Sequence, residues 1–147
     1  MSAGHDDPAG HDDHAAPAGL RFFAPGAGPA VFAARADVVF APPTPAAQIR
    51  AQVEAFLHDL GDALALAGCE LVGHIKGTLD AGAQGSLLFS LTSLDRDARV
   101  VDTLCADPVA ALFTINVIVF GVAENALAGL VAQTWASRIP ALTTWRR

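Results

Sequence analysis

Two copies of one short string, Gly-His-Asp-Asp, lie within the first fourteen residues of this 147-residue chain. The copies span residues 4–7 and 10–13, and His14 directly follows the second copy. Imidazole nitrogens and carboxylate oxygens together suit Zn, Ni, Co or Cu, and tandem copies raise the local ligand concentration without requiring a folded site. The expected ligands of a divalent transition metal are His5, Asp7, His11, Asp13 and His14. The alternative is an acidic leader whose histidines are incidental.

In composition, this segment resembles the His-rich stretches attached to metallochaperones and metal-delivery GTPases. The resemblance covers about fourteen residues and rests on their histidines and aspartates rather than on a fixed spacing. The phosphate-loop pattern GxxxxGK[ST] is missing from the sequence, so the chain is not itself expected to be a GTPase. The resemblance therefore implies an accessory or acceptor protein in metal delivery.

A second candidate site lies in a β-hairpin that the sequence predicts over residues 70–93. Two strand-like runs, 70–79 and 86–93, flank a loop that contains glycine. Because successive side chains of a strand point to opposite faces, one side of the first run collects the polar residues. That polar side holds Glu70, Val72, His74, Lys76 and Thr78, and the other side holds Leu71, Gly73, Ile75, Gly77 and Leu79.

The pairing of these two strands decides which polar side chains meet. If residues 80 and 86 close the loop, Lys76 lies opposite Ser90. A register two residues away brings His74 opposite Ser90 instead. A further apolar strand over residues 112–120 adds hydroxyl and amide groups if it lies beside the hairpin. The candidate catalytic or ligand-binding residues are His74, Lys76, Ser90 and Asn116, with Thr114 beside them.

Lys76 is the only lysine of the chain, and it lies two residues from His74. A lysine beside an imidazole in a shielded groove can act as a base, as a Schiff-base nucleophile or as an anchor for an anion. The alternative is a solvated lysine on a wet sheet face, neutralised by Glu70 or Asp80. The chain contains neither GxSxG nor HExxH, and Gly26-Ala27-Gly28 is not a dinucleotide fingerprint. Whether the protein is an enzyme stays open.

Hydrophobic periodicity predicts six elements. Strict alternation indicates a strand over 31–40, and a period of 3.6 residues indicates a helix that starts at Thr44-Pro45 and ends at Gly68. Three strands and a helix follow, over residues 70–79, 86–93, 112–120 and 124–137. The order β-α-β-β-β-α is typical of an α+β two-layer sandwich, with an antiparallel or mixed sheet of about four strands and two helices on one face.

Composition divides the chain into a tail and a body. Residues 1–20 have no hydrophobic periodicity, so we expect a His/Asp-rich tail that is disordered without metal. Residues 21–147 are expected to form a single α+β domain. Hydrophobic residues make up 52% of the chain, charged residues only 16%, and the mean hydropathy is +0.40. So much apolar surface favours a homo-oligomer or a protein partner.

Charge and segment length exclude two kinds of partner. The net charge is −6 and lysines and arginines form no cluster, so a nucleic-acid partner is not expected. The most apolar stretch, 109–123, is too short to span a membrane, for which about twenty residues are needed.

The N-terminus lacks the pattern of a secretion signal, so a cytoplasmic location is expected. Cys69 and Cys105 form no CxxC pair, and both are expected to be buried thiols.

Three hypotheses follow from these observations. The first is a small cytoplasmic accessory protein whose tail binds a transition metal for handling or delivery. The second is a small oligomeric enzyme or ligand-binding protein that uses the sheet face with His74 and Lys76. The third is a structural or regulatory subunit, which the excess of apolar residues would suit.

Overall fold

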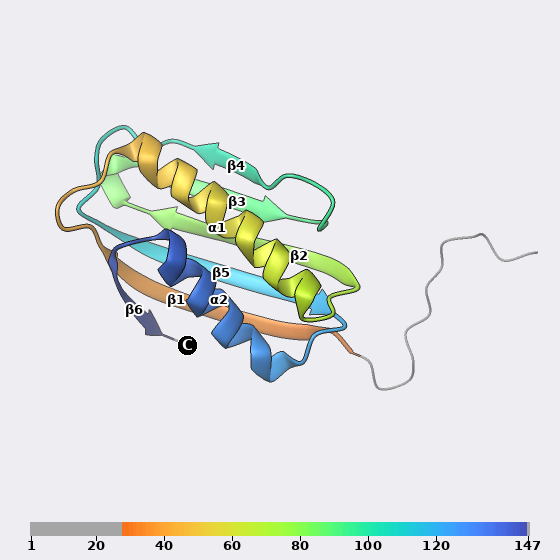
Figure 1. Ribbon diagram of the computed structural model, residues 1–147. Coiled ribbons are helices and arrows are strands. Elements are labelled where there is room, and N and C mark those ends of the chain that lie inside the picture. The colour runs from red at the N-terminus through yellow and green to blue at the C-terminus, as the bar shows by residue number, and fades with distance from the viewer. Residues whose placement is uncertain (1–27, 147) are drawn as a thin grey trace, which may run out of the picture.

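Both helices lie on one face of a six-stranded antiparallel sheet in the computed structural model, which describes residues 28–146 (Figure 1). The sheet order is β4-β3-β2-β5-β1-β6. In chain order, the elements are β1 (Ala30–Val39), α1 (Ala46–Leu66), β2 (Leu71–Asp80), the short 3-10 helix η1 (Gly82–Gln84), β3 (Ser86–Leu91), β4 (Arg99–Asp102), β5 (Ala110–Phe120), α2 (Glu124–Arg138) and β6 (Leu142–Arg146).

The α+β class is confirmed, whereas the expected number of about four strands is wrong. The structure adds β4 and β6, the two edge strands of the sheet, and every strand pair is antiparallel. Both edge strands are short, with four and five residues, so neither carries enough alternation for a sequence pattern to reveal it. The expected tail, residues 1–20, lies outside the described residues.

Helix α1 has the expected amphipathic pattern. Its buried stripe faces the sheet and consists of Ile49, Val53, Phe56, Leu57, Leu60, Gly61 and Leu64. Gly68 follows the helix in the left-handed region, with φ of 94°, and its N–H donates to the carbonyl of Ala65 at 3.1 Å. Glycine adopts this conformation without the strain of a Cβ atom, so Gly68 ends the helix as expected.

Strand β2 contains a β-bulge that the sequence does not reveal. Against β5, Val72 pairs with Val119 and His74 pairs with Ile118, so Gly73 is an extra residue. One extra residue reverses the alternation on its N-terminal side. Leu71 is therefore 47% exposed and Val72 is buried, which corrects the sides expected for these two residues. From His74 onward the polar and apolar sides are as expected.

Aromatic rings form the centre of the core between sheet and helices. The ring of Phe113 from β5 lies 3.9 Å, centroid to centroid, from Trp135 of α2, and 6.1 Å from Phe56 of α1. Trp135 is buried, and its indole N–H donates to the hydroxyl of Thr143 at 3.0 Å, which ties β6 to α2. Trp135 is therefore a core residue.

The two cysteines are not both buried, contrary to expectation. Cys105 is exposed in the loop between β4 and β5. Cys69 is partly buried between α1 and β2, and desolvation raises the pKa of its thiol. Both cysteines lie in loops rather than within a core strand, which explains the difference.

An ion pair joins the two helices on their outer side. The guanidinium of Arg138 donates to both carboxylate oxygens of Asp59, with Nη2 at 3.1 Å from Oδ1. This bidentate contact lowers the pKa of Asp59 below its usual value.

Within residues 28–146, neither helix combines the length and the apolarity that crossing a bilayer requires.

Gly77 provides a test of the sheet packing. A Cβ atom at this position would lie 2.1 Å from the carbonyl oxygen of Thr114 and 2.3 Å from Cζ of Phe89. We expect Gly77→Ala to lower the free energy of unfolding in urea by about 1–3 kcal/mol, because the neighbours include backbone. A Cβ atom at Gly129 of α2 would have no neighbour within 4 Å, so Gly129→Ala should raise the free energy of unfolding by about 0.5–1 kcal/mol. Equal effects of the two substitutions would contradict this packing.

Candidate functional site

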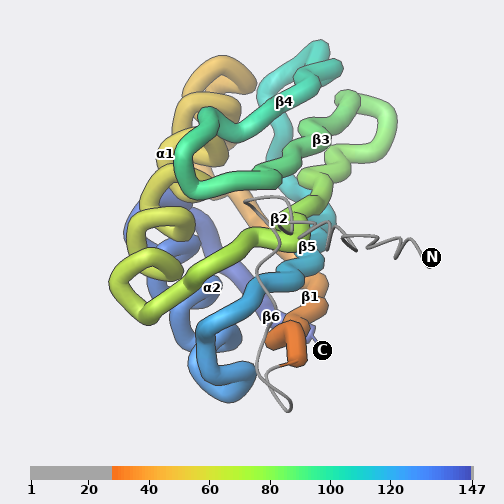
Figure 2. The backbone as a smooth tube through the Cα atoms, turned by 90° about the vertical axis from the view of Figure 1, so that its right-hand side faces the viewer, coloured from red at the N-terminus to blue at the C-terminus, as the bar shows by residue number. Residues whose placement is uncertain are grey.

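The face of the sheet opposite the helices is uncovered in the described part of the chain (Figure 2). Seven large apolar side chains from the strands are between 37% and 71% exposed on this face, which we call the open face. They are Val31, Val39, Leu71, Leu88, Val101, Leu112 and Leu142. The solvent face of an antiparallel sheet is normally polar. An apolar face of this extent is typical of a surface that another molecule covers.

The apolar side chains lie at the margins of the open face. Leu88 and Val101 are paired between β3 and β4. Val39 is paired with Leu142 near one end of the sheet, and Val31 is paired with Ile118 near the other. Apolar groups of another molecule can therefore contact the margins of the open face, whereas the centre of this face is polar.

The centre of the open face brings together three of the four candidate residues. Lys76 pairs with Ser90 of β3 on one side and with Asn116 of β5 on the other. Residues 80 and 86 close the hairpin, as in the first of the two registers considered. Thr114, the fifth polar residue expected there, pairs with Thr78, and their hydroxyl oxygens are 2.8 Å apart.

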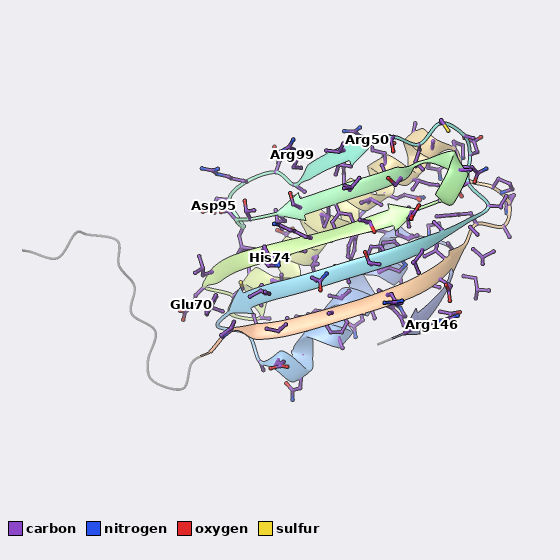
Figure 3. The ribbon with its side chains drawn as sticks, turned by 180° about the vertical axis from the view of Figure 1, so that it is seen from behind. Arg50, Glu70, His74, Asp95, Arg99 and Arg146 are labelled. Atoms are coloured by element: carbon purple, nitrogen blue, oxygen red, sulfur yellow. The ribbon has the colours of Figure 1, made fainter. Side chains whose placement is uncertain are left out.

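His74 lies one step away from this group. It pairs with Ile118 on the same face, near the end of β2 that carries the bulge (Figure 3). Within residues 28–146, no hydrogen bond links His74 to Lys76 or Ser90. An activated nucleophile needs a base within hydrogen-bond reach, so this arrangement favours binding over covalent catalysis.

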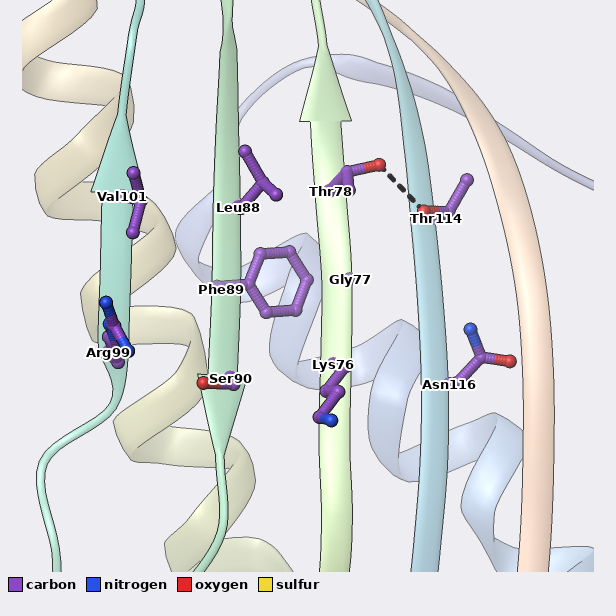
Figure 4. A pocket seen from close by; sticks show the side chains of 10 residues that line it. All are labelled: Lys76, Gly77, Thr78, Leu88, Phe89, Ser90, Arg99, Val101, Thr114 and Asn116. Carbon is purple, nitrogen blue, oxygen red and sulfur yellow. Dashed lines mark hydrogen bonds between the residues drawn. The ribbon is translucent and has the colours of Figure 1, made fainter.

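A shallow depression of about 440 Å³ lies between β4, β3, β2 and β5 (Figure 4). Lys76 and Arg99 lie on either side of Ser90, since Arg99 pairs with Ser90 across β4 and β3. Gly77 adds no side chain, so the ring of Phe89 beside it contributes to the lining. The depression thus combines two cations, hydroxyl and amide groups, and the apolar side chains of Leu88 and Val101.

Positive charge predominates on the open face. Four cationic side chains extend from its strands, and the carboxylates there are Asp37 and Asp80. Asp37 is already ion-paired with Arg146. The remaining cations have no carboxylate within 4.0 Å among residues 28–146; they are Arg35, Lys76 and Arg99. Because the whole chain has a net charge of −6, this face differs in sign from the rest of the molecule.

Sequence reasoning missed Arg99 and Arg35 as parts of the site. The four-residue strand β4 leaves almost no periodic signal in the sequence, so Arg99 could not be assigned to a strand. Alternation within β1 does not show which residues lie beside Arg35, and only the sheet order shows that its side of β1 continues the face of Lys76.

The helix side carries one group of possible metal ligands. His58, Asp59 and Asp62 of α1 offer ligand atoms within 4.8 Å of one another. Asp59 is engaged by Arg138, and the side chain of His58 is 73% exposed. A metal would have to displace the guanidinium of Arg138 from Asp59, so this group is a solvated helix surface. The expected metal ligands in residues 5–14 lie outside the described residues.

Comparison with known proteins gives no match of any kind. No protein-family model matches the chain, and neither a curated protein nor a solved structure matches it.

Adjacent leucines of β3 test whether the open face serves binding rather than folding. Leu87 is fully buried, and Leu88 is 47% exposed on the open face. Leu87→Ala should lower the free energy of unfolding by about 2–5 kcal/mol, because it leaves a cavity in the core. Leu88→Ser should change it by about 0.5 kcal/mol or less. Urea unfolding followed by tryptophan fluorescence measures both, and a large loss for Leu88→Ser would make this side chain part of the fold.

Proposed function

We propose that this protein is an accessory subunit that binds an acidic, partly apolar segment of a polypeptide on the open face of its sheet. The observation that carries this proposal is a set of three cations that have no carboxylate partner among residues 28–146 and are surrounded by exposed apolar side chains, namely Arg35, Lys76 and Arg99. Charged groups that have no partner of their own are ready to bind carboxylates of another molecule.

The depression is suited to one carboxylate side chain of such a segment. Lys76 and Arg99 supply the charge, and Ser90 and Asn116 supply hydrogen bonds between and beside them. Neighbouring strands are about 4.8 Å apart, so the two cations lie about 10 Å apart and a carboxylate between them reaches both. The apolar margins then bury aliphatic or aromatic side chains of the same segment, which contributes about 25 cal/mol for each Å² removed from water.

A face-to-face homodimer fits this surface less well. Two copies related by a two-fold axis would place the same cations against each other, because such an interface uses one patch twice. Like charges facing each other in an interface cost several kcal/mol. The expected partners were a second copy of the chain or another protein. The charge of the open face favours another protein with an acidic segment.

Charge reversal on the open face tests this proposal. The probe is a fluorescent synthetic peptide with paired aspartates and two phenylalanines, measured by anisotropy. We expect Lys76→Glu and Arg99→Glu each to weaken its binding about tenfold, which corresponds to about 1.4 kcal/mol. Arg96→Glu is the matched control, because this substitution makes the same change of charge in an exposed loop beside α1. If all three substitutions weaken peptide binding equally, the affinity depends only on the net charge of the protein, which would contradict the proposal.

A second candidate function is metal handling by the tail of a cytoplasmic accessory protein. The observation that favours it is the repeated Gly-His-Asp-Asp string with His14 after it. Three imidazoles and neighbouring carboxylates within ten residues provide enough ligands for Zn, Ni, Co or Cu without a preformed pocket. This function concerns the tail and is independent of the open face.

Calorimetric titration with each metal tests the tail. Binding to the full chain should be lost in the triple variant His5→Ala, His11→Ala and His14→Ala, and it should fade below about pH 6.5 as free imidazoles become protonated. The control is His58→Ala with His74→Ala, which leaves the tail intact. If the triple variant binds as tightly as the wild type, the tail is not the metal site.

A further inference from the structure

We infer that the open face is occupied, in the free protein, by the chain's own N-terminal segment, residues 1–27. This inference rests on the proposed function, because it assumes that the face takes an acidic, partly apolar segment. It adds a regulatory element: an outside partner must displace a segment that is covalently attached next to the site.

Charge complementarity is the first argument. Residues 1–27 contain four aspartates and one arginine, Arg21, so their side chains carry a net charge of −3 with the histidines neutral. The open face offers three cations without a carboxylate partner among residues 28–146, namely Arg35, Lys76 and Arg99. The net charge of the segment is therefore opposite in sign to that of the open face.

The spacing of the charges also agrees. Arg99 on β4 and Arg35 on β1 are four strand positions apart, with Lys76 on the middle strand β2. At about 4.8 Å per strand, and with a shift of two residues along the strand, the two arginines are about 20 Å apart. The aspartate pairs of the segment, 6–7 and 12–13, are six residues apart and span about 20 Å when extended.

The apolar part of the segment is within reach of an apolar margin. Phe22 and Phe23 precede the first described residue, Gly28, by only a few positions, and an extended chain covers about 17 Å between residues 23 and 28. Strand β1 begins at Ala30, and the exposed Val31 next to it pairs with Ile118. The two phenylalanine rings can therefore cover Val31, Ile118 and nearby Leu71.

Tethering favours this occupant over a free one. A segment attached by a short linker acts at an effective concentration of about a millimolar, so weak contacts suffice to keep it bound. The attachment point at β1 lies on the sheet itself, next to the margin that the phenylalanines would cover. The same segment of a second copy carries the same charge but lacks the tether.

The experiment compares the full chain with two variants of the segment. The Asn variant is Asp6→Asn with Asp7→Asn, Asp12→Asn and Asp13→Asn, and the other is Phe22→Ser with Phe23→Ser. Two readouts are followed: the methyl NMR signals of Val31, Ile118 and Leu88, and the affinity for a synthetic peptide of residues 4–27. His5→Ala with His11→Ala and His14→Ala is the control, because it removes the expected metal ligands and leaves charge and rings in place.

We expect the methyl signals of the open face to shift in both segment variants, while the buried methyls of Leu57 and Leu64 stay unchanged. The peptide should bind the Asn variant about tenfold more tightly than the wild type, since a tethered competitor has been removed. The histidine control should behave as the wild type in both readouts.

Other outcomes separate this inference from the proposed function. If the peptide binds wild type and variants with equal affinity, the face takes acidic segments and the N-terminal segment is not its occupant, which overturns the inference only. If the peptide binds none of the proteins and no methyl signal moves, both proposals are overturned. Methyl shifts that change with protein concentration would identify a second copy as the occupant and also overturn the inference.

Discussion

The structure depends on one-sided burial of its sheet. Helices α1 and α2 pack on a single face, where the rings of Phe113, Trp135 and Phe56 contact one another, and every fully buried large side chain of the described chain belongs to that layer. The apolar area that stabilises the fold is removed from water there. The second face contributes little to this core, and its apolar side chains remain available for another molecule.

The placement of the polar centre follows from the same constraint. Because Ile75 and Leu79 must lie under the helices, the alternation of β2 sends Lys76 and Thr78 to the open face. Gly77 supports this arrangement by leaving room for the ring of Phe89 beside it. The antiparallel pairing then aligns Arg99, Ser90, Lys76 and Asn116 in one row across four strands. The site is thus a consequence of sheet order and register, not of a sequence motif.

Local patterns predicted most elements, while the outer parts of the sheet required the structure. The long periodic segments of α1 and β1 have the expected extents to within about two residues, because each has a continuous buried stripe. The bulge at Gly73 reversed Leu71 and Val72, since an inserted residue changes the alternation without changing composition. Arg99 entered the site only through the short edge strand β4, and Arg35 only through the position of β1 beside β5.

The central claim is that the open face is a binding surface for an acidic polypeptide segment. The most direct measurement is the relaxation that a soluble paramagnetic agent causes in the methyl groups of the full chain, with the peptide of residues 4–27 at saturation. The account predicts that Leu88, Val101 and Val31 are protected from the agent, whereas Leu66, which is 91% exposed at the end of α1, is relaxed strongly. Relaxation of the open-face methyls as strong as that of Leu66 would contradict it.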